Sequence, residues 1–170
     1  MTIIERLAKI LLGKDNNPPL FRAIERGNVA KVRTLLDEGA DAAMQNAAGS
    51  SALTVAVMHG RVEVARLLIE RGADLEREGH DRLDAAVNKR NLAMVELLLD
   101  AGVDVNAASG WELLTALHIA ASGGHTEMVD LLLARGADPE ARDRRMETPL
   151  MKASKRGHAT CVALLSSTPE

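Results

Sequence analysis

Five histidines and one cysteine are the residues of this 170-residue chain with the most versatile chemistry. Such residues hold zinc or form nucleophilic pairs only at characteristic spacings, with further cysteine or carboxylate ligands nearby. No pair of them has that spacing here. Cys161 stands alone, which excludes a disulfide within the chain and favours a reducing compartment. The sequence therefore predicts no catalytic residue, no metal site and no cofactor.

The composition argues against two further classes of function. The formal net charge is −3, and Phe21 and Trp111 are the only aromatic residues. A nucleic-acid-binding protein needs positive charge and stacking rings, and both are scarce here. No stretch approaches the ~20 apolar residues that span a bilayer. We expect a cytoplasmic protein that binds neither nucleic acid nor membrane.

An internal repeat determines which elements must position any functional residue. A glycine, replaced once by arginine, recurs every 30 to 34 residues, each time seven residues after a leucine. The recurring positions are Gly27, Gly60, Arg90, Gly124 and Gly157. Alanines, apolar pairs and Gly-Ala-Asp turns recur in the same register. A period of this length indicates stacked units, none of which buries its apolar face alone.

Each copy of the repeat predicts two helices. The first begins after a capping residue such as Ser51 or Thr115 and ends at the recurring glycine. The second is amphipathic, as in residues 62–70 and 126–134. The Asp of each turn is too regular to be catalytic, and we expect it to brace its own loop.

These recurring positions resemble the ankyrin repeat. The match rests on Thr115-Ala116-Leu117-His118, Gly124-His125 and Gly136-Ala137-Asp138, and it extends over about residues 17–167. The resemblance implies an all-α solenoid of helix–loop–helix units with β-hairpin fingers between them. It also implies that His118 bonds to the backbone of the next finger, and that partner proteins bind at the fingertips and inner helices.

The resemblance implies a simple domain organisation. We expect an N-terminal capping helix over residues 1–16 and an ankyrin repeat domain over residues 17–170. Its repeats would cover about residues 17–45, 46–78, 79–108, 109–142 and 143–170. The first segment carries an apolar stripe at helical spacing, which favours a cap on the first repeat. Anchorage to a membrane or to a partner is the alternative.

The third repeat departs from the pattern in two ways. The finger before it, residues 75–81, is about three residues shorter than the others, so we expect no proper hairpin there. Arg90 stands where the other copies have glycine. Sequence drift in a tolerant solenoid explains both features, and a dent shaped for one partner is the alternative.

Trp111 is the first candidate for a binding residue. It follows a turn glycine near a fingertip, and tryptophan is enriched at the centres of protein interfaces. Packing against the adjacent finger is the alternative. Leu113 or Leu114 would extend the same patch if its side chain faces solvent.

Cations gather in the fifth repeat and would steer an acidic partner. A charged terminal repeat that keeps the protein soluble is the alternative. By resemblance, other inner-helix ends also face the partner. The candidate partner-binding residues are Trp111, Leu113, Met58, His59, Asn88, Lys89, Arg144, Arg145, Lys155 and Arg156.

The sequence thus predicts a monomeric, non-enzymatic module that binds another protein, one with an acidic patch. An inhibitor or regulatory subunit that occludes the active site of an enzyme or toxin would share the same fold and surface. That alternative stays open.

Overall fold

The computed structural model describes residues 18–75 and 79–167. Within these ranges the chain forms ten helices, arranged as five consecutive pairs, and no β-strand. The all-α fold of paired helices predicted from the repeat is confirmed. The capping helix expected over residues 1–16 lies outside the described residues. None of the described helices is long and apolar enough to cross a membrane.

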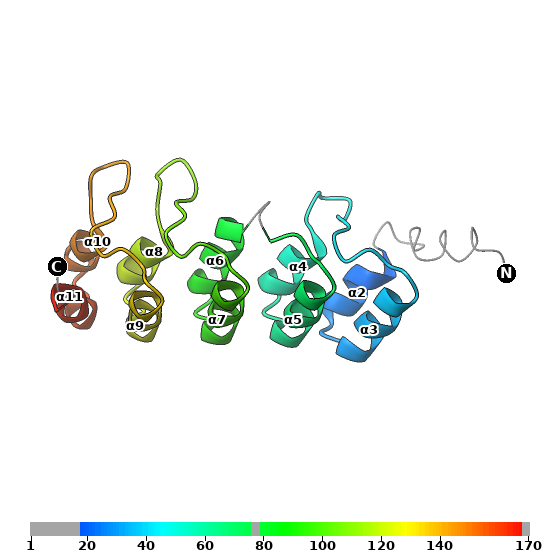
Figure 1. Cartoon of the computed structure of the whole chain (residues 1–170). Helices are drawn as coiled ribbons and strands as arrows, with labels where there is room; N and C mark the ends of the chain where they lie inside the picture. Colours follow the sequence, from blue (N-terminus) through cyan, green and yellow to red (C-terminus); the bar gives the residue numbers. More distant parts are fainter. Residues whose placement is uncertain (1–17, 76–78, 168–170) are drawn as a thin grey trace. The chain divides into compact units, whose positions relative to one another are not determined.

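The chain divides into two compact units, Met1–Arg77 and Glu78–Glu170, which we call the first and the second unit. The described helices of the first unit are α2 (Pro19–Glu25), α3 (Val29–Asp37), α4 (Ala52–Met58) and α5 (Val62–Glu70). In each pair the earlier helix is the inner one. The inner helices α2 and α4 pack together, and so do α3 and α5, which gives two layers (Figure 1). Phe21 of α2 is fully buried.

The second unit repeats this arrangement over three pairs. Its helices are α6 (Gly79–Asn88), α7 (Leu92–Asp100), α8 (Ala116–Gly123), α9 (Thr126–Ala134), α10 (Pro149–Arg156) and α11 (Ala159–Ser166). The inner helix α8 packs between α6 and α10, while α9 packs against α11. Cys161 of α11 is buried and unpaired with another cysteine, as expected of a core thiol.

Hydrogen bonds at the helix starts confirm the predicted caps. The side chains of Ser51, Thr115 and Thr148 each accept a hydrogen bond from the backbone N–H three residues later. This satisfies a donor that has no partner within the helix. At α8 the bond is reciprocal, because the His118 ring accepts one from the Thr115 N–H.

The turn aspartates brace their own loops, as predicted. Asp41, Asp104 and Asp138 each accept a hydrogen bond from the N–H two residues later, at 2.8 to 2.9 Å. Their regularity therefore has a structural explanation.

The third repeat is irregular at both expected places. Arg90 follows α6 with a φ of 55°, whereas glycine occupies the equivalent left-handed position after α8, at Gly124. That conformation costs a non-glycine residue roughly 1–2 kcal/mol. In addition, α6 begins already at Gly79, so residues 79–81 of the short finger belong to the helix.

At two junctions a side chain of the later repeat lies over the end of the preceding inner helix; we call this contact the inter-repeat latch. In the first unit, Arg61 lies over Gly27, and its guanidinium donates to the Glu25 carbonyl at 2.9 Å. In the second unit, the His158 ring lies over Gly124, where a Cβ would clash with it.

The latch is missing at one junction. His158 Nε2 lies 3.1 Å from the Ser122 carbonyl oxygen, and the equivalent partner of His125 would be the Asn88 carbonyl. Arg90, however, places a side chain where that ring would need a glycine. Among the described residues, His125 Nδ1 is buried without a hydrogen-bond partner. The described residues contain no hydrogen bond from His125 to the end of α6, so this junction lacks the bond that His158 makes to the end of α8.

Three loops between helix pairs form the fingers, residues 45–51, 109–114 and 142–147. Isolated bridges close two of them, Gln45 with Ser51 and Ser109 with Leu114. The expected β-hairpins are therefore reduced to single bridges in the 45–51 and 109–114 fingers, and the described 142–147 finger has no bridge.

Candidate functional site

The inner helices and fingers of the second unit line a groove of about 620 Å³. Its floor is the end of α8, where Ile119, Ser122 and Gly123 face the groove. The small side chain of Ser122 and the lack of one at Gly123 leave the groove deep at this point. A Cβ at Gly123 would clash with the His125 ring, so the missing side chain lets this ring pack there.

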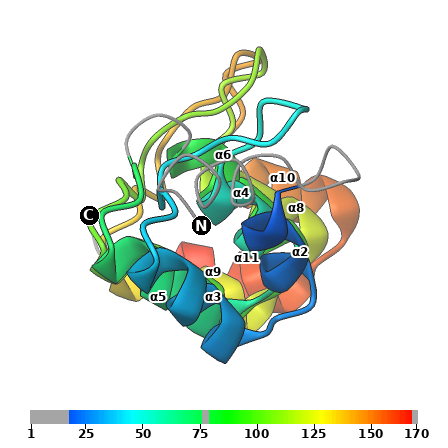
Figure 2. The same cartoon turned by 90° about the vertical axis from the view of Figure 1, so that its right-hand side faces the viewer.

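Two fingers form the upper wall of the groove and are joined along their length. The N–H of Arg144 donates to the Glu112 carbonyl at 2.9 Å. The guanidinium of Arg145 reaches the carboxylate of Glu112 at 3.5 Å. The two loops run side by side in both views (Figures 1 and 2).

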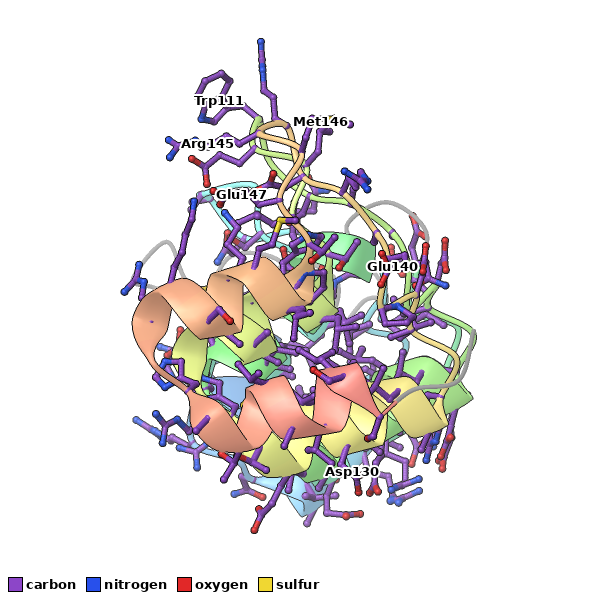
Figure 3. All side chains as sticks on the ribbon, turned by 90° about the vertical axis from the view of Figure 1, so that its left-hand side faces the viewer. Trp111, Asp130, Glu140, Arg145, Met146 and Glu147 are labelled. Atoms are coloured by element: carbon purple, nitrogen blue, oxygen red, sulfur yellow. The ribbon has the colours of Figure 1, made fainter. Side chains whose placement is uncertain are left out.

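Trp111 lies at the tip of the first of these fingers. The Arg144 guanidinium is 4.2 Å from the centre of the indole ring, a cation–π contact. Nevertheless 68% of the Trp111 surface stays exposed. The adjacent finger therefore contacts the ring but does not bury it (Figure 3).

Leu113 and Met146 occupy equivalent positions at the two tips and share an unusual backbone. Their φ angles are 55° and 60°, in the left-handed region that favours glycine. They are also 50% and 61% exposed. Two apolar side chains thus face solvent at positions where glycine would relieve strain.

A buried carboxylate holds the 142–147 finger in place. Asp143 is 3% exposed and accepts hydrogen bonds from the N–H groups of Arg145 and Glu147, at 2.8 and 2.9 Å. The Lys152 ammonium lies 2.6 Å from its other oxygen. Burial alone would raise the pKa of Asp143, but Lys152 and the two N–H groups outweigh it and lower the pKa to about 2.

Glu147 connects this network to the groove. Its carboxylate accepts a hydrogen bond from Lys155 and lies 3.2 Å from the Lys152 ammonium. These two ammonium groups lower the pKa of Glu147. The carboxylate is therefore charged and already occupied by cations of α10.

His118 ties α8 to the same finger, as the resemblance implied. Its Nδ1 accepts from the Thr115 N–H, so the opposite nitrogen, Nε2, carries the proton and donates to the Glu147 carbonyl at 3.0 Å. Burial lowers the pKa of His118 and favours this neutral form. Its role is to position the finger.

The structure places seven of the eight predicted residues of the second unit in two groups. Four of them line the groove: Asn88, Arg145, Lys155 and Arg156. Three lie at the fingertips: Trp111, Leu113 and Arg144. The remaining one, Lys89, is exposed just after α6 and does not line the groove.

Met58 and His59 belong to the first unit. Both are exposed at the carboxyl end of α4.

The sequence reasoning missed Glu112, Ile119, Met146, Glu147 and Lys152 as residues of this site. One signal could have found Met146, because it occupies the same repeat position as Leu113. The roles of Glu147 and Lys152 depend on contacts between a loop and a helix, which the repeat pattern does not specify.

Metal chemistry has no candidate among the described residues, since they contain no group of three His, Cys, Asp or Glu side chains placed to hold an ion. The arrangement offers instead a preformed groove, charged side chains along its edge and exposed apolar tips. These are features of a binding surface.

Comparison with known proteins agrees with the repeat pattern. The family described as ankyrin repeats (3 copies) matches residues 3–79, 20–109 and 83–169. The chain is 35% identical over 153 residues to the mouse B-cell lymphoma 3 protein homolog, which covers 85% of this chain and 34% of the relative.

Two further relatives come from distant organisms. A putative ankyrin repeat-containing protein of Treponema pallidum is 35% identical over 122 residues, 69% of this chain and 41% of the relative. The ankyrin repeat and KH domain-containing protein mask-1 of Caenorhabditis elegans is 32% identical over 155 residues, 87% of this chain and 6% of the relative. The chain thus spans less than half the length of each of these three relatives. With family matches over most of its length, the chain belongs to the ankyrin-repeat family.

Proposed function

We propose that the second unit binds a partner protein in its groove and across its fingertips, without catalysing a reaction. Ankyrin repeats generally mediate protein–protein interactions. The observation that carries the proposal is the pair of exposed apolar residues, Leu113 and Met146, held in left-handed backbone at adjacent tips. Folding stability alone favours glycine there, so the retained side chains indicate a contact outside the chain.

The proposal includes the properties expected from the sequence. We infer a monomeric, cytoplasmic protein whose residues 17–170 form one domain of five repeats. The partner carries an acidic patch, because the α10 edge of the groove presents Lys155 and Arg156. The buried free thiol of Cys161 is compatible with a reducing compartment.

Site-specific photo-crosslinking tests this function. A photoreactive phenylalanine analogue replaces Trp111 in one full-length variant and Asp130 in another, and both are irradiated in a lysate of the native host. Asp130 is the matched control, because it is exposed on α9, away from the fingertips (Figure 3).

We expect a discrete protein adduct at position 111 that is absent at position 130. Unlabelled wild-type protein should compete it away, and the Met146→Gly variant should compete less well. Equal adducts at both positions, or none at position 111, would contradict the proposal.

A further inference from the structure

The cations along the groove differ in how far the protein itself already uses them. Lys152 lies between two carboxylates, at 2.6 Å from Asp143 and 3.2 Å from Glu147. Its side chain is mostly buried. Lys152 is therefore committed to holding the 142–147 finger and is not available to a partner.

Two guanidinium groups remain available. Arg156 is exposed at the groove edge, and no hydrogen bond or ion pair holds it among the described residues. Arg145 reaches Glu112 only at 3.5 Å, with most of its side chain in solvent. Such a loose, exposed pair contributes little to stability. Both groups can thus turn toward an incoming anion.

Lys155 is intermediate between Lys152, which the fold already uses, and the two arginines, which remain available. Its side chain is largely exposed, and its ammonium is bonded to the carboxylate of Glu147, which is 16% exposed. Glu147 thus places a carboxylate of the chain itself in the groove. This carboxylate occupies the Lys155 ammonium, which could otherwise bind a carboxylate of a partner.

The floor beside these charges is partly apolar. Ile119 and Leu114 are half-buried and line the groove next to the small residues Ser122 and Gly123. An occupant therefore needs apolar side chains for the floor and carboxylates for the α10 edge. An extended peptide supplies both, because successive side chains alternate in direction.

We propose that the groove binds an extended acidic peptide segment with alternating apolar residues, a carboxylate of which displaces Glu147 from Lys155 and also pairs with Arg156. Glu147 then acts as an internal competitor that lowers the affinity of the empty groove. This inference rests on the proposed function and specifies the chemistry of the partner.

A nucleic acid fits the same cations less well. Glu112 and Glu147 both line the groove and would repel a phosphate backbone. Trp111 is the exposed aromatic side chain near the groove, and Arg144 is already stacked on it. A single strand binds through several bases that each stack on a ring, and one tryptophan provides only one such ring. A peptide carboxylate can replace Glu147 one for one.

Fluorescence anisotropy with the full-length chain tests this inference. The probe is a fluorescein-labelled peptide, Glu-Leu-Glu-Leu-Glu-Leu, and its analogue with Gln in place of each Glu tests the need for charge. Labelled oligothymidylate serves as the polyanion probe. We expect the acidic peptide to bind more tightly than both, and its affinity to fall with added salt.

Two variants test the roles of individual residues. Arg156→Gln should weaken the acidic peptide about two- to fivefold, the range of an exposed ion pair. Glu147→Gln should strengthen it by a similar factor, since an uncharged amide competes less for Lys155. Each has a control in the second unit with the same change in net charge, Arg135→Gln and Asp130→Asn, and neither control site lines the groove.

Three results would overturn the inference: equal binding of the acidic and amide peptides, tighter binding of oligothymidylate, or an effect of Glu147→Gln no larger than that of Asp130→Asn. Circular dichroism of each variant establishes that it is folded, and Arg156→Gln removes no hydrogen bond or ion pair among the described residues. Any of these results, combined with a specific adduct at position 111, would reject the acidic peptide and leave the proposed function standing.

Discussion

Each unit has a finger whose loop is held by one polar side chain: residues 45–51 in the first unit and residues 142–147 in the second. We call this side chain the brace. The two fingers are braced in the same way but differ at their tips. Asn46 and Asp143 occupy equivalent positions. Each accepts hydrogen bonds from the N–H groups two and four residues later. Only Asp143 adds a charge and an ion pair, with Lys152.

The tips differ more than the braces. The first-unit tip is Ala47-Ala48-Gly49, and its left-handed residue is the glycine, with a φ of 79°. The second unit places Leu113 and Met146 at that position. The turn itself therefore does not need a large side chain at the residue with positive φ. The larger tips of the second unit add strain and exposed apolar surface, as the proposed binding role of these tips requires.

The largest difference in unfolding free energy is expected when the brace of each finger, Asp143 or Asn46, is replaced by alanine. Asp143→Ala should lower the free energy of unfolding by about 3 kcal/mol, because it leaves Lys152 mostly buried with one carboxylate fewer. Asn46→Ala removes the same two hydrogen bonds without a charge and should cost about 1 kcal/mol. Urea denaturation followed by circular dichroism measures both. Equal losses would show that the ion pair adds nothing.

Acid should affect the two braces differently. The folded pKa of Asp143, about 2, lies below its usual value of 3.8. Its contribution is therefore complete above that usual value and is lost as the pH falls toward 2. We expect wild type to lose roughly 1–2 kcal/mol more than Asp143→Asn across this interval. Denaturation curves at several pH values measure the difference, and parallel profiles would contradict the assignment.

Exchanging the tip residues should change stability in opposite directions. Gly49→Ala places a Cβ in left-handed backbone and should destabilise the protein by about 1 kcal/mol. Met146→Gly relieves the same strain and should stabilise it by up to about 1 kcal/mol, while weakening partner binding. Thermal unfolding and the crosslinking competition measure the two effects. A destabilised Met146→Gly would mean that its side chain supports the fold.

The smallest effect on stability is expected at Trp111. Its main contact is the Arg144 guanidinium, and exposed cation–π pairs contribute about 0.5–1 kcal/mol. Trp111→Ala should therefore leave the melting temperature nearly unchanged and still reduce the yield of partner complex. A large drop in melting temperature would assign the ring to packing instead.

The helices could be predicted well because their signals are local and repeat five times. Residues 62–70 and 126–134 are helical with the predicted bounds. The caps at Ser51 and Thr115 follow from the same pattern.

The site could be predicted only in part. Fingertip exposure follows from the position of Trp111 in the repeat, but the ion-pair network does not. Lys152 is one of several cations in its repeat, and only the folded loop shows that it is bound to Asp143. Arg156, by contrast, has no ion-pair partner in the part of the chain that the structure describes. The early start of α6 at Gly79 also escaped prediction, because a shortened finger does not specify what replaces the hairpin.

The missing inter-repeat latch has a mechanical consequence. The bond from His158 to the Ser122 carbonyl resists sliding between the α8–α9 and α10–α11 pairs. Between α6–α7 and α8–α9 the described residues contain no such bond from His125, although Ser109 donates a hydrogen bond to Asp84 of α6. We therefore expect stiffness along the second unit to be uneven, with the softer joint at the end of the groove that carries Asn88. A rocking motion there would widen or narrow the groove at that end while the cationic end on α10 keeps its shape.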